Sequence, residues 1–98
     1  MRFSFLKRRL RNLFENEAGA GVFAEGVVDA FFEVMAVIAA AKDERDLYAL
    51  KSLHFEKLRG DRSHERSLRL TKKWRLIVEI ESGSDGNTIV VKDIEDYH

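Results

Sequence analysis

The sequence predicts an α+β fold in which two to three N-terminal helices pack on one face of a small antiparallel β-sheet. The main observation is a change of hydrophobic period, from three to four residues in the first half of the chain to two residues in the second half. A second observation is that the 98 residues contain no repeat, linker or low-complexity segment. The chain is therefore expected to form a single domain over residues 1–98.

The first half of the sequence is predicted to be helical. A first helix is indicated by five apolar residues that share one face at helical spacing: Phe3, Leu6, Leu10, Leu13 and Phe14. A short strand at residues 1–4 can precede this helix. After a break at residues 19–23, a long second helix is predicted to run to about Lys42, and a short third helix to cover Glu44–Leu50.

The most apolar stretch, residues 22–41, is about long enough to span a membrane. It carries Glu25, Asp29 and Glu33 along one helical face, and charges are costly in hydrocarbon. No secretory signal is apparent at the N-terminus, and the chain has no cysteine. We therefore expect an amphipathic helix in a cytoplasmic protein that does not associate with membranes.

The second half of the sequence is predicted to form strands. Polar and apolar residues alternate in Ser67–Leu70 and again in Trp74–Ile80. In the second run the apolar residues at even positions share one face, and Arg75 projects from the other. A turn-rich loop at residues 82–87 leads to a last β-branched strand over Thr88–Ile94.

Charge is unevenly distributed along this chain of zero net charge. Residues 51–75, which we call the basic block, carry nine Lys/Arg and three acidic residues. Eight of its cations fall on the predicted strands and turns: Lys57, Arg59, Arg62, Arg66, Arg69, Lys72, Lys73 and Arg75. Such a cluster favours phosphate binding, although a solvated face with salt bridges to the acidic second helix is the other interpretation.

The C-terminal residues Asp96, Tyr97 and His98 all carry side chains that can donate or accept a proton. Together with Arg75 and the basic block, they suit metal-free RNA cleavage, in which a ribose 2′-OH attacks the adjacent phosphate. Arginine on a rigid strand would stabilise the developing charge. Histidine, with an ordinary pKa near ~6.5, suits either proton-transfer role.

Two other motifs are set aside. The segment at 19–24 matches the dinucleotide fingerprint G-x-G-x-x-A, but it follows a predicted helix rather than a strand. His54 and His64 are ten residues apart and have no third ligand at a recognisable spacing. We therefore expect neither a metal ion nor another cofactor.

Four segments in this order resemble HigB-type toxins of the RelE/ParE toxin superfamily: HFEKLRGDR (54–62), SLRL (67–70), KWRL (73–76) and DYH (96–98). The resemblance runs over nearly the whole chain and implies a RelE-like fold. It also implies a type II toxin-antitoxin toxin that acts as an mRNA interferase. Such ribosome-dependent endonucleases cut mRNA in the A site and stop translation.

Carried over by position, the resemblance gives Arg75 the role of supporting the transition state, and Asp96, Tyr97 and His98 that of a terminal catalytic triplet. Arg59 falls where a lysine is commoner and would contact phosphate. Five further cations of the basic block are the candidate RNA-binding residues: Lys57, Arg62, Arg69, Lys72 and Lys73. Glu56 departs from the family pattern, because some members have histidine at this position.

The implied partners are the ribosome, mRNA and a cognate HigA-like antitoxin with a helix-turn-helix, which would form a hetero-oligomer with the toxin. Two non-catalytic alternatives stay open on the same scaffold. One is a ParE-like protein that poisons gyrase by binding, and the other is a decayed toxin that survives as an antitoxin-binding module. Arg75 and the terminal triplet favour the enzyme, because a pure binding protein needs neither.

Overall fold

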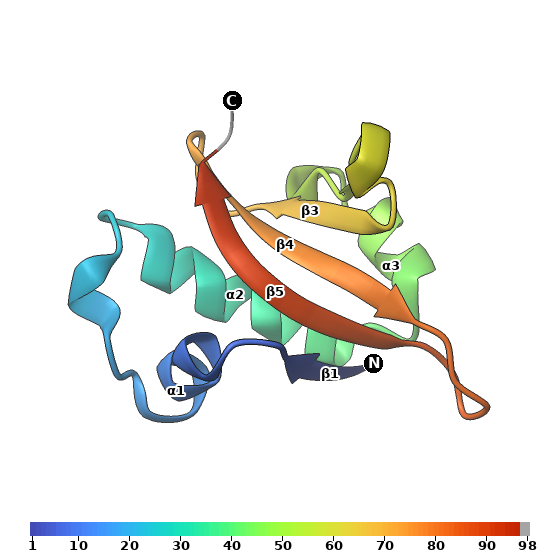
Figure 1. Cartoon of the computed structure of the whole chain (residues 1–98), viewed down its shortest axis with the longest axis horizontal. Helices are drawn as coiled ribbons and strands as arrows, with labels where there is room; N and C mark the ends of the chain where they lie inside the picture. Colours follow the sequence, from blue (N-terminus) through green and yellow to red (C-terminus); the bar gives the residue numbers. More distant parts are fainter. Residues whose placement is uncertain (97–98) are drawn as a thin grey trace.

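A computed structural model describes residues 1–96 of the chain (Figure 1). The elements follow in the order β1 (Arg2–Phe5), α1 (Arg8–Asn16), η1 (Ala20–Val22), α2 (Val27–Ala40), α3 (Glu44–Ala49), η2 (Lys51–Leu53), β2 (Glu56–Lys57), η3 (Gly60–Arg62), β3 (Glu65–Arg69), β4 (Trp74–Glu81) and β5 (Thr88–Asp96), where η marks a short 3₁₀ helix. The predicted α+β class is confirmed.

The five strands form one sheet in the order β1-β5-β4-β3-β2. Strands β2 to β5 pair as an antiparallel meander, as predicted. However, β1 pairs in parallel with β5, with Phe3 opposite Ile89, so the sheet is mixed rather than antiparallel. A parallel pair needs a long crossover connection, and here β1 and β5 lie near opposite ends of the chain. No local sequence pattern encodes this pairing.

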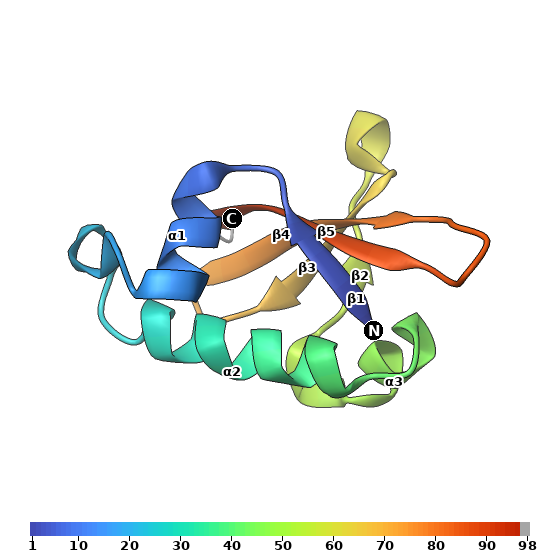
Figure 2. The same cartoon turned by 90° about the horizontal axis from the view of Figure 1, so that it is seen from below.

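The helices α2 and α3 lie against one face of the sheet, and the loop that contains η3 stands on the other side (Figure 2). The core between the helices and the sheet is built from residues of nearly every element, including Leu10, Leu13, Phe31, Met35, Ile38, Leu68, Leu76, Val78, Ile89 and Val91. We call the sheet face that α2 and α3 leave uncovered the open face.

The boundaries of the first helix differ from the prediction. Helix α1 begins at Arg8, Phe3 belongs to β1, and Leu6 is 61% exposed in the intervening turn. The spacing of Phe3 and Leu6 thus matched a helical face by coincidence, since Phe3 and Phe5 follow the period of a strand. Within residues 1–96, no helix is long and apolar enough to cross a membrane.

Candidate active site on the open face

Arg75 is the second residue of β4, near the centre of the sheet. Its neighbour Trp74 packs against the hydrophobic core, as does Leu76. Because successive side chains of a strand point to opposite faces, Arg75 projects from the open face, as predicted. In the sheet register it lies opposite Glu95 of β5 and opposite Arg69 of β3.

A cluster of five charged residues, which we call the open-face network, surrounds this position: Arg62, Glu65, Glu79, Lys92 and Glu95. All three guanidinium nitrogens of Arg62 donate hydrogen bonds. Nε donates to Glu65 at 2.6 Å, and Nη1 and Nη2 donate to the two carboxylate oxygens of Glu95 at 2.9 and 2.8 Å. Lys92 donates to the second oxygen of Glu65 at 2.5 Å and lies 3.7 Å from Glu79.

The contacts within the network shift the pKa values of Glu65, Arg62 and Lys92. Burial by itself raises the pKa of Glu65, but hydrogen bonds from Lys92 and Arg62 outweigh it and hold this pKa below its usual range. Hydrogen bonds to Glu95 and Glu65 raise the pKa of Arg62. The hydrogen bond to Glu65 likewise raises the pKa of Lys92. Each ion is therefore compensated by a partner of opposite charge.

The centre of the open face is buried although no helix covers it. Ile77 is 1% exposed yet lies outside the core cluster, and its cross-strand partner Ser67 is 3% exposed. The neighbouring pairs, Glu65 with Glu79 and Arg75 with Glu95, supply the long side chains that flank these two residues. Charged side chains can cover apolar surface with their hydrocarbon stems, so these side chains also shield the centre of the open face from solvent.

A bulge and two ion pairs position β5 at this face. The register between β4 and β5 shifts at Ile77/Val78, which is typical of a strand that bends and redirects its side chains. Further along β5, Asp93 accepts from Lys7 at 2.7 Å and from Arg9 of α1 at 3.1 Å. These contacts tie the start of α1 to the strand that leads into the C-terminal residues.

The structure separates the predicted RNA-binding residues into two groups. Four cations are exposed in loops and on the edge strand: Lys57, Arg59, Lys72 and Lys73. Arg62, by contrast, is engaged by two carboxylates. Arg69 lies at the sheet edge, where Nη1 is 3.3 Å from Nε2 of His54, and lines a hollow of about 250 Å³ beside α2.

The ion pairs of the basic block also bear on its alternative interpretation. Arg62 pairs with Glu65 and Glu95, and His64 lies 3.4 Å from Glu79. No ion pair among residues 1–96 joins the basic block to the acidic residues of the second helix region, Glu25, Asp29 and Glu33. The exposed cations of the block are thus available to an external anion.

The terminal triplet lies only partly within the described residues. Asp96 is exposed at the end of β5, opposite Trp74. Since cross-strand partners share a face, the Asp96 side chain leaves the strand on the side of Trp74, and Glu95 leaves it on the side of Arg75. Tyr97 and His98 lie outside the described residues, so their roles stay predictions from the sequence.

The site residues predicted from the sequence did not include Glu65, Lys92, Asp93 or Glu95, which shape the open face. One signal was present, because Asp93 and Glu95 alternate with apolar residues along a β-branched strand and therefore share a face. Their partners could not be inferred, since these come from α1 and from η3. Within residues 1–96, no three histidine, aspartate or glutamate side chains gather in a way that could hold a metal ion.

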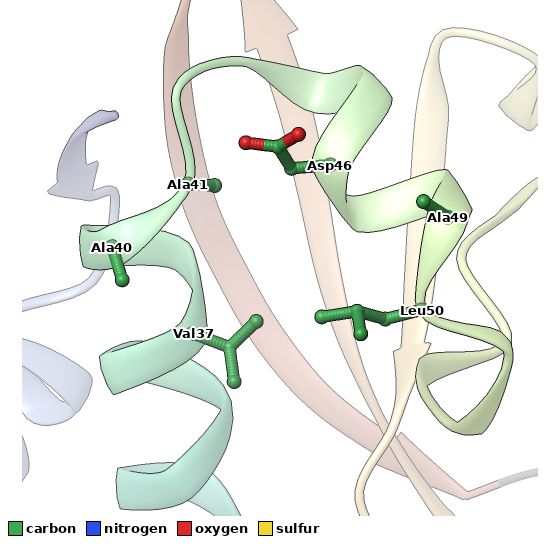
Figure 3. A pocket seen from close by; sticks show the side chains of 6 residues that line it. All are labelled: Val37, Ala40, Ala41, Asp46, Ala49 and Leu50. Atoms are coloured by element: carbon green, nitrogen blue, oxygen red, sulfur yellow. The ribbon is translucent and has the colours of Figure 1, made fainter.

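An apolar groove of about 420 Å³ lies elsewhere, between the end of α2 and α3 (Figure 3). It is lined by Val37, Ala40, Ala41, Asp46, Ala49 and Leu50. Figure 3 shows Val37 and Leu50 facing each other across it, with the Asp46 carboxylate at one end. The groove is on the helical side of the sheet, so it is not part of the open face.

The fold resembles that of a class of toxins with solved structures. A solved structure of a YoeB/ParE toxin from Agrobacterium tumefaciens is similar to this chain, with a TM-score of 0.58 and 15% sequence identity over 100% of both chains. The fold is therefore that of a RelE/YoeB-like toxin. No curated protein is a significant match.

The sequence gives the family within this class. Residues 3–98 match the HigB-like toxins, described as the RelE-like toxin of the type II toxin-antitoxin system HigB. The match covers nearly the whole chain, so the chain belongs to this family. Membership of a type II toxin family implies an antitoxin partner.

Proposed function

We propose that this chain is a ribosome-dependent mRNA endonuclease that cuts mRNA in the A site and so inhibits translation. In the proposed reaction a base removes the proton of a ribose 2′-OH, and the oxygen attacks the adjacent phosphorus. The bond to the 5′-oxygen breaks, and an acid protonates that oxygen. The products are a 2′,3′-cyclic phosphate and a 5′-hydroxyl, and these steps need only proton transfer and charge stabilisation.

The observation that carries the proposal is the position of Arg75 on the open face. It projects from a central strand that is paired on both sides, which fixes its backbone. A guanidinium on such a rigid element can donate two hydrogen bonds to the phosphate oxygens as negative charge develops on them. We propose that this is its role in the reaction.

The exposed cations of the basic block provide the proposed path for the RNA backbone. Lys57 and Arg59 lie at and just after β2, and Lys72 and Lys73 lie in the turn between β3 and β4. We propose that these four residues, together with Arg69 at the sheet edge, contact phosphates. Their contribution is electrostatic and independent of sequence.

The terminal triplet supplies the proposed proton-transfer groups. Asp96 ends β5 one residue after Glu95, and its side chain leaves the strand on the side of Trp74 rather than on the open face of Arg75. We propose that Asp96, Tyr97 and His98 include the base and the acid of the reaction, and His98, with an ordinary pKa near ~6.5, suits either role. We further propose that the protein acts in the cytoplasm and is neutralised there by a HigA-like helix-turn-helix antitoxin.

A reconstituted assay tests this function. The purified chain is mixed with a defined mRNA, either free or bound to ribosomes with an empty A site, and the new RNA ends are identified chemically. We expect 5′-hydroxyl and cyclic phosphate ends on the ribosome-bound mRNA only. Intact mRNA with inhibited gyrase supercoiling would instead support the ParE-like binding protein, and an effect in neither assay would support the decayed toxin.

A further inference from the structure

The loop between β2 and β3, residues 58–64, carries Arg59, which is one of the proposed phosphate contacts. Its two ends are joined where the backbone N–H of Leu58 donates to the carbonyl oxygen of Glu65 at 3.0 Å. Beyond this closure, none of the three residues of η3 is buried. A segment with few buried apolar contacts opens more readily than the rest of a fold, so the orientation of this loop depends on its polar contacts.

Arg62 supplies the most extensive of these contacts. Its Nη1 and Nη2 donate to both oxygens of Glu95 at 2.9 and 2.8 Å, in the paired geometry that makes arginine–carboxylate contacts strong. Its Nε donates at 2.6 Å to Glu65, which is 6% exposed. A second tether of the loop, His64 at 3.4 Å from Glu79, is an ion pair only when the histidine is protonated. The guanidinium of Arg62 thus fastens the loop to β5.

The helix η3 transmits this constraint to Arg59. The backbone N–H of Arg62 donates to the carbonyl oxygen of Arg59 at 3.3 Å, and that of Ser63 donates to Gly60 at 3.2 Å. Gly60 has a φ of +67°, a left-handed conformation that glycine adopts without strain. Because one tight 3₁₀ turn joins the two arginines, fixing the side chain of Arg62 limits where the exposed Arg59 can lie.

We infer that Arg62 is a positioning residue that clamps η3 to β5 and thereby holds Arg59 where the RNA backbone can reach it. This inference rests on the proposed function. It gives Arg62 a different role from the phosphate contact expected from the sequence, because its three guanidinium nitrogens already donate to carboxylates. A side chain that is held in place beforehand binds more tightly than one that must be ordered on binding.

Limited proteolysis with trypsin tests the clamp without any RNA. Trypsin cleaves after arginine and lysine, and a nick after Arg59 can be identified by mass spectrometry. Arg62→Ala should speed this nick about tenfold or more, and Glu95→Ala should speed it to a smaller degree, because the loop is released. Arg45→Ala removes an arginine that pairs with Asp43 at 2.7 Å next to α3, and it should not change the rate. Unchanged nicking in either folded clamp variant would overturn the inference.

A double-mutant cycle of single-turnover cleavage on ribosome-bound mRNA tests what the clamp does for the reaction. It uses the full chain and yields the protein concentration at which the rate is half-maximal. We expect Arg59→Ala and Arg62→Ala each to raise this concentration about tenfold. The double variant should stay within about threefold of Arg59→Ala, because Arg62 acts through Arg59. Two independent phosphate contacts would instead multiply to about a hundredfold, and that result would overturn the inference.

Glu95→Ala distinguishes positioning from simple electrostatics by the sign of its effect. If only charge mattered, removing a carboxylate near the RNA would strengthen binding and lower the half-maximal concentration. Loss of the clamp should instead raise this concentration, and the increase should disappear in the Arg59→Ala background. A lower concentration for Glu95→Ala would contradict the clamp.

Urea unfolding shows whether each variant is folded. In Arg62→Ala the buried Glu65 keeps Lys92 as a partner. If this variant nevertheless does not fold, both experiments are run with Arg62→Lys, which keeps a cation but cannot hold both oxygens of Glu95 and should show smaller defects of the same kind.

The two experiments separate the inference from the proposed function. Arg45→Ala should leave cleavage unchanged, as it does nicking. If the unaltered chain cuts no ribosome-bound mRNA, the proposed function fails, and the role of the clamp in it fails as well. The proteolysis still shows in that case whether Arg62 holds the loop.

Discussion

Arg62 and Arg75 belong to the same basic block, but their surroundings in the folded protein differ. The Arg62 guanidinium is held by Glu65 and Glu95, whereas Arg75 lies on a strand directly opposite Glu95. A count of positive residues along the sequence treats the two as equivalent. The distinction appears only when the loop with η3 is folded over the open face.

The role proposed for Arg75 gives the first prediction for a single residue. Arg75→Ala should lower the rate of mRNA cleavage about a hundredfold or more, because a donor to developing charge is lost. Arg75→Lys should recover only part of the rate, since lysine keeps the charge but not the paired donors. Single-turnover cleavage measures both, with Arg45→Ala as the control. Full recovery by lysine would contradict bidentate stabilisation.

The pH dependence of folding provides a second prediction at this scale. The pKa of Glu65 is lower in the folded protein than in the unfolded chain. Its contribution to stability is therefore complete above its unfolded pKa of about 4.3 and is lost as the pH falls through the folded value. Glu65→Gln should make the free energy of unfolding less dependent on pH between about 5 and 3. Urea unfolding curves for the two proteins that shift in parallel over this range would contradict the assignment.

At the scale of elements, the sequence predicted the three helices and the three long strands, because each has a clear hydrophobic period. It did not predict the pairing of β1 with β5, which joins Arg2–Phe5 to residues 88–91 across the whole chain. The sequence did not predict the open-face network either, because Arg62 meets Glu95, and Lys92 meets Glu65, only through the folding of the meander. Local periodicity thus determined elements, while contacts between distant segments determined the site.

The packing of β1, α1 and α2 on one another can be tested through Phe31. This residue is fully buried, and its ring centroid lies 6.4 Å from that of Phe5 and 6.5 Å from that of Phe14. Phe31→Ala should reduce the free energy of unfolding by about 3–5 kcal/mol, because it leaves a cavity where three elements meet. Chemical denaturation measures this, with Val22→Ala, at a 73% exposed position, expected to change it by less than about 0.5 kcal/mol. Similar values for the two variants would contradict this packing.

At the scale of the whole molecule, the zero net charge conceals a separation of charges along the chain. Association with a nucleic acid depends on the local potential of the contacting surface rather than on the net charge. The exposed cations Lys57, Arg59, Lys72 and Lys73 should therefore make ribosome binding weaken as salt is added. A surface of opposite, negative charge is the simplest means by which an antitoxin can cover these cations.

Salt dependence supplies the prediction for the whole molecule. The logarithm of the ribosome-binding constant should fall linearly with the logarithm of the salt concentration. The double variant Lys72→Ala/Lys73→Ala should reduce this slope, because fewer counterions are released when it binds. Equilibrium sedimentation with ribosomes at several salt concentrations measures the slopes. Identical slopes for the two proteins would exclude the β3–β4 turn from the RNA interface.

The most direct measurement is a map of RNA 5′ ends in bacteria after brief induction of this chain, compared with the Arg75→Ala variant. We predict new 5′-hydroxyl ends inside translated reading frames with the unaltered chain and none with the variant, whose level and folding are checked in the same cells. Growth arrest in both strains without new ends would contradict the enzymatic account and support a toxin that acts by binding alone.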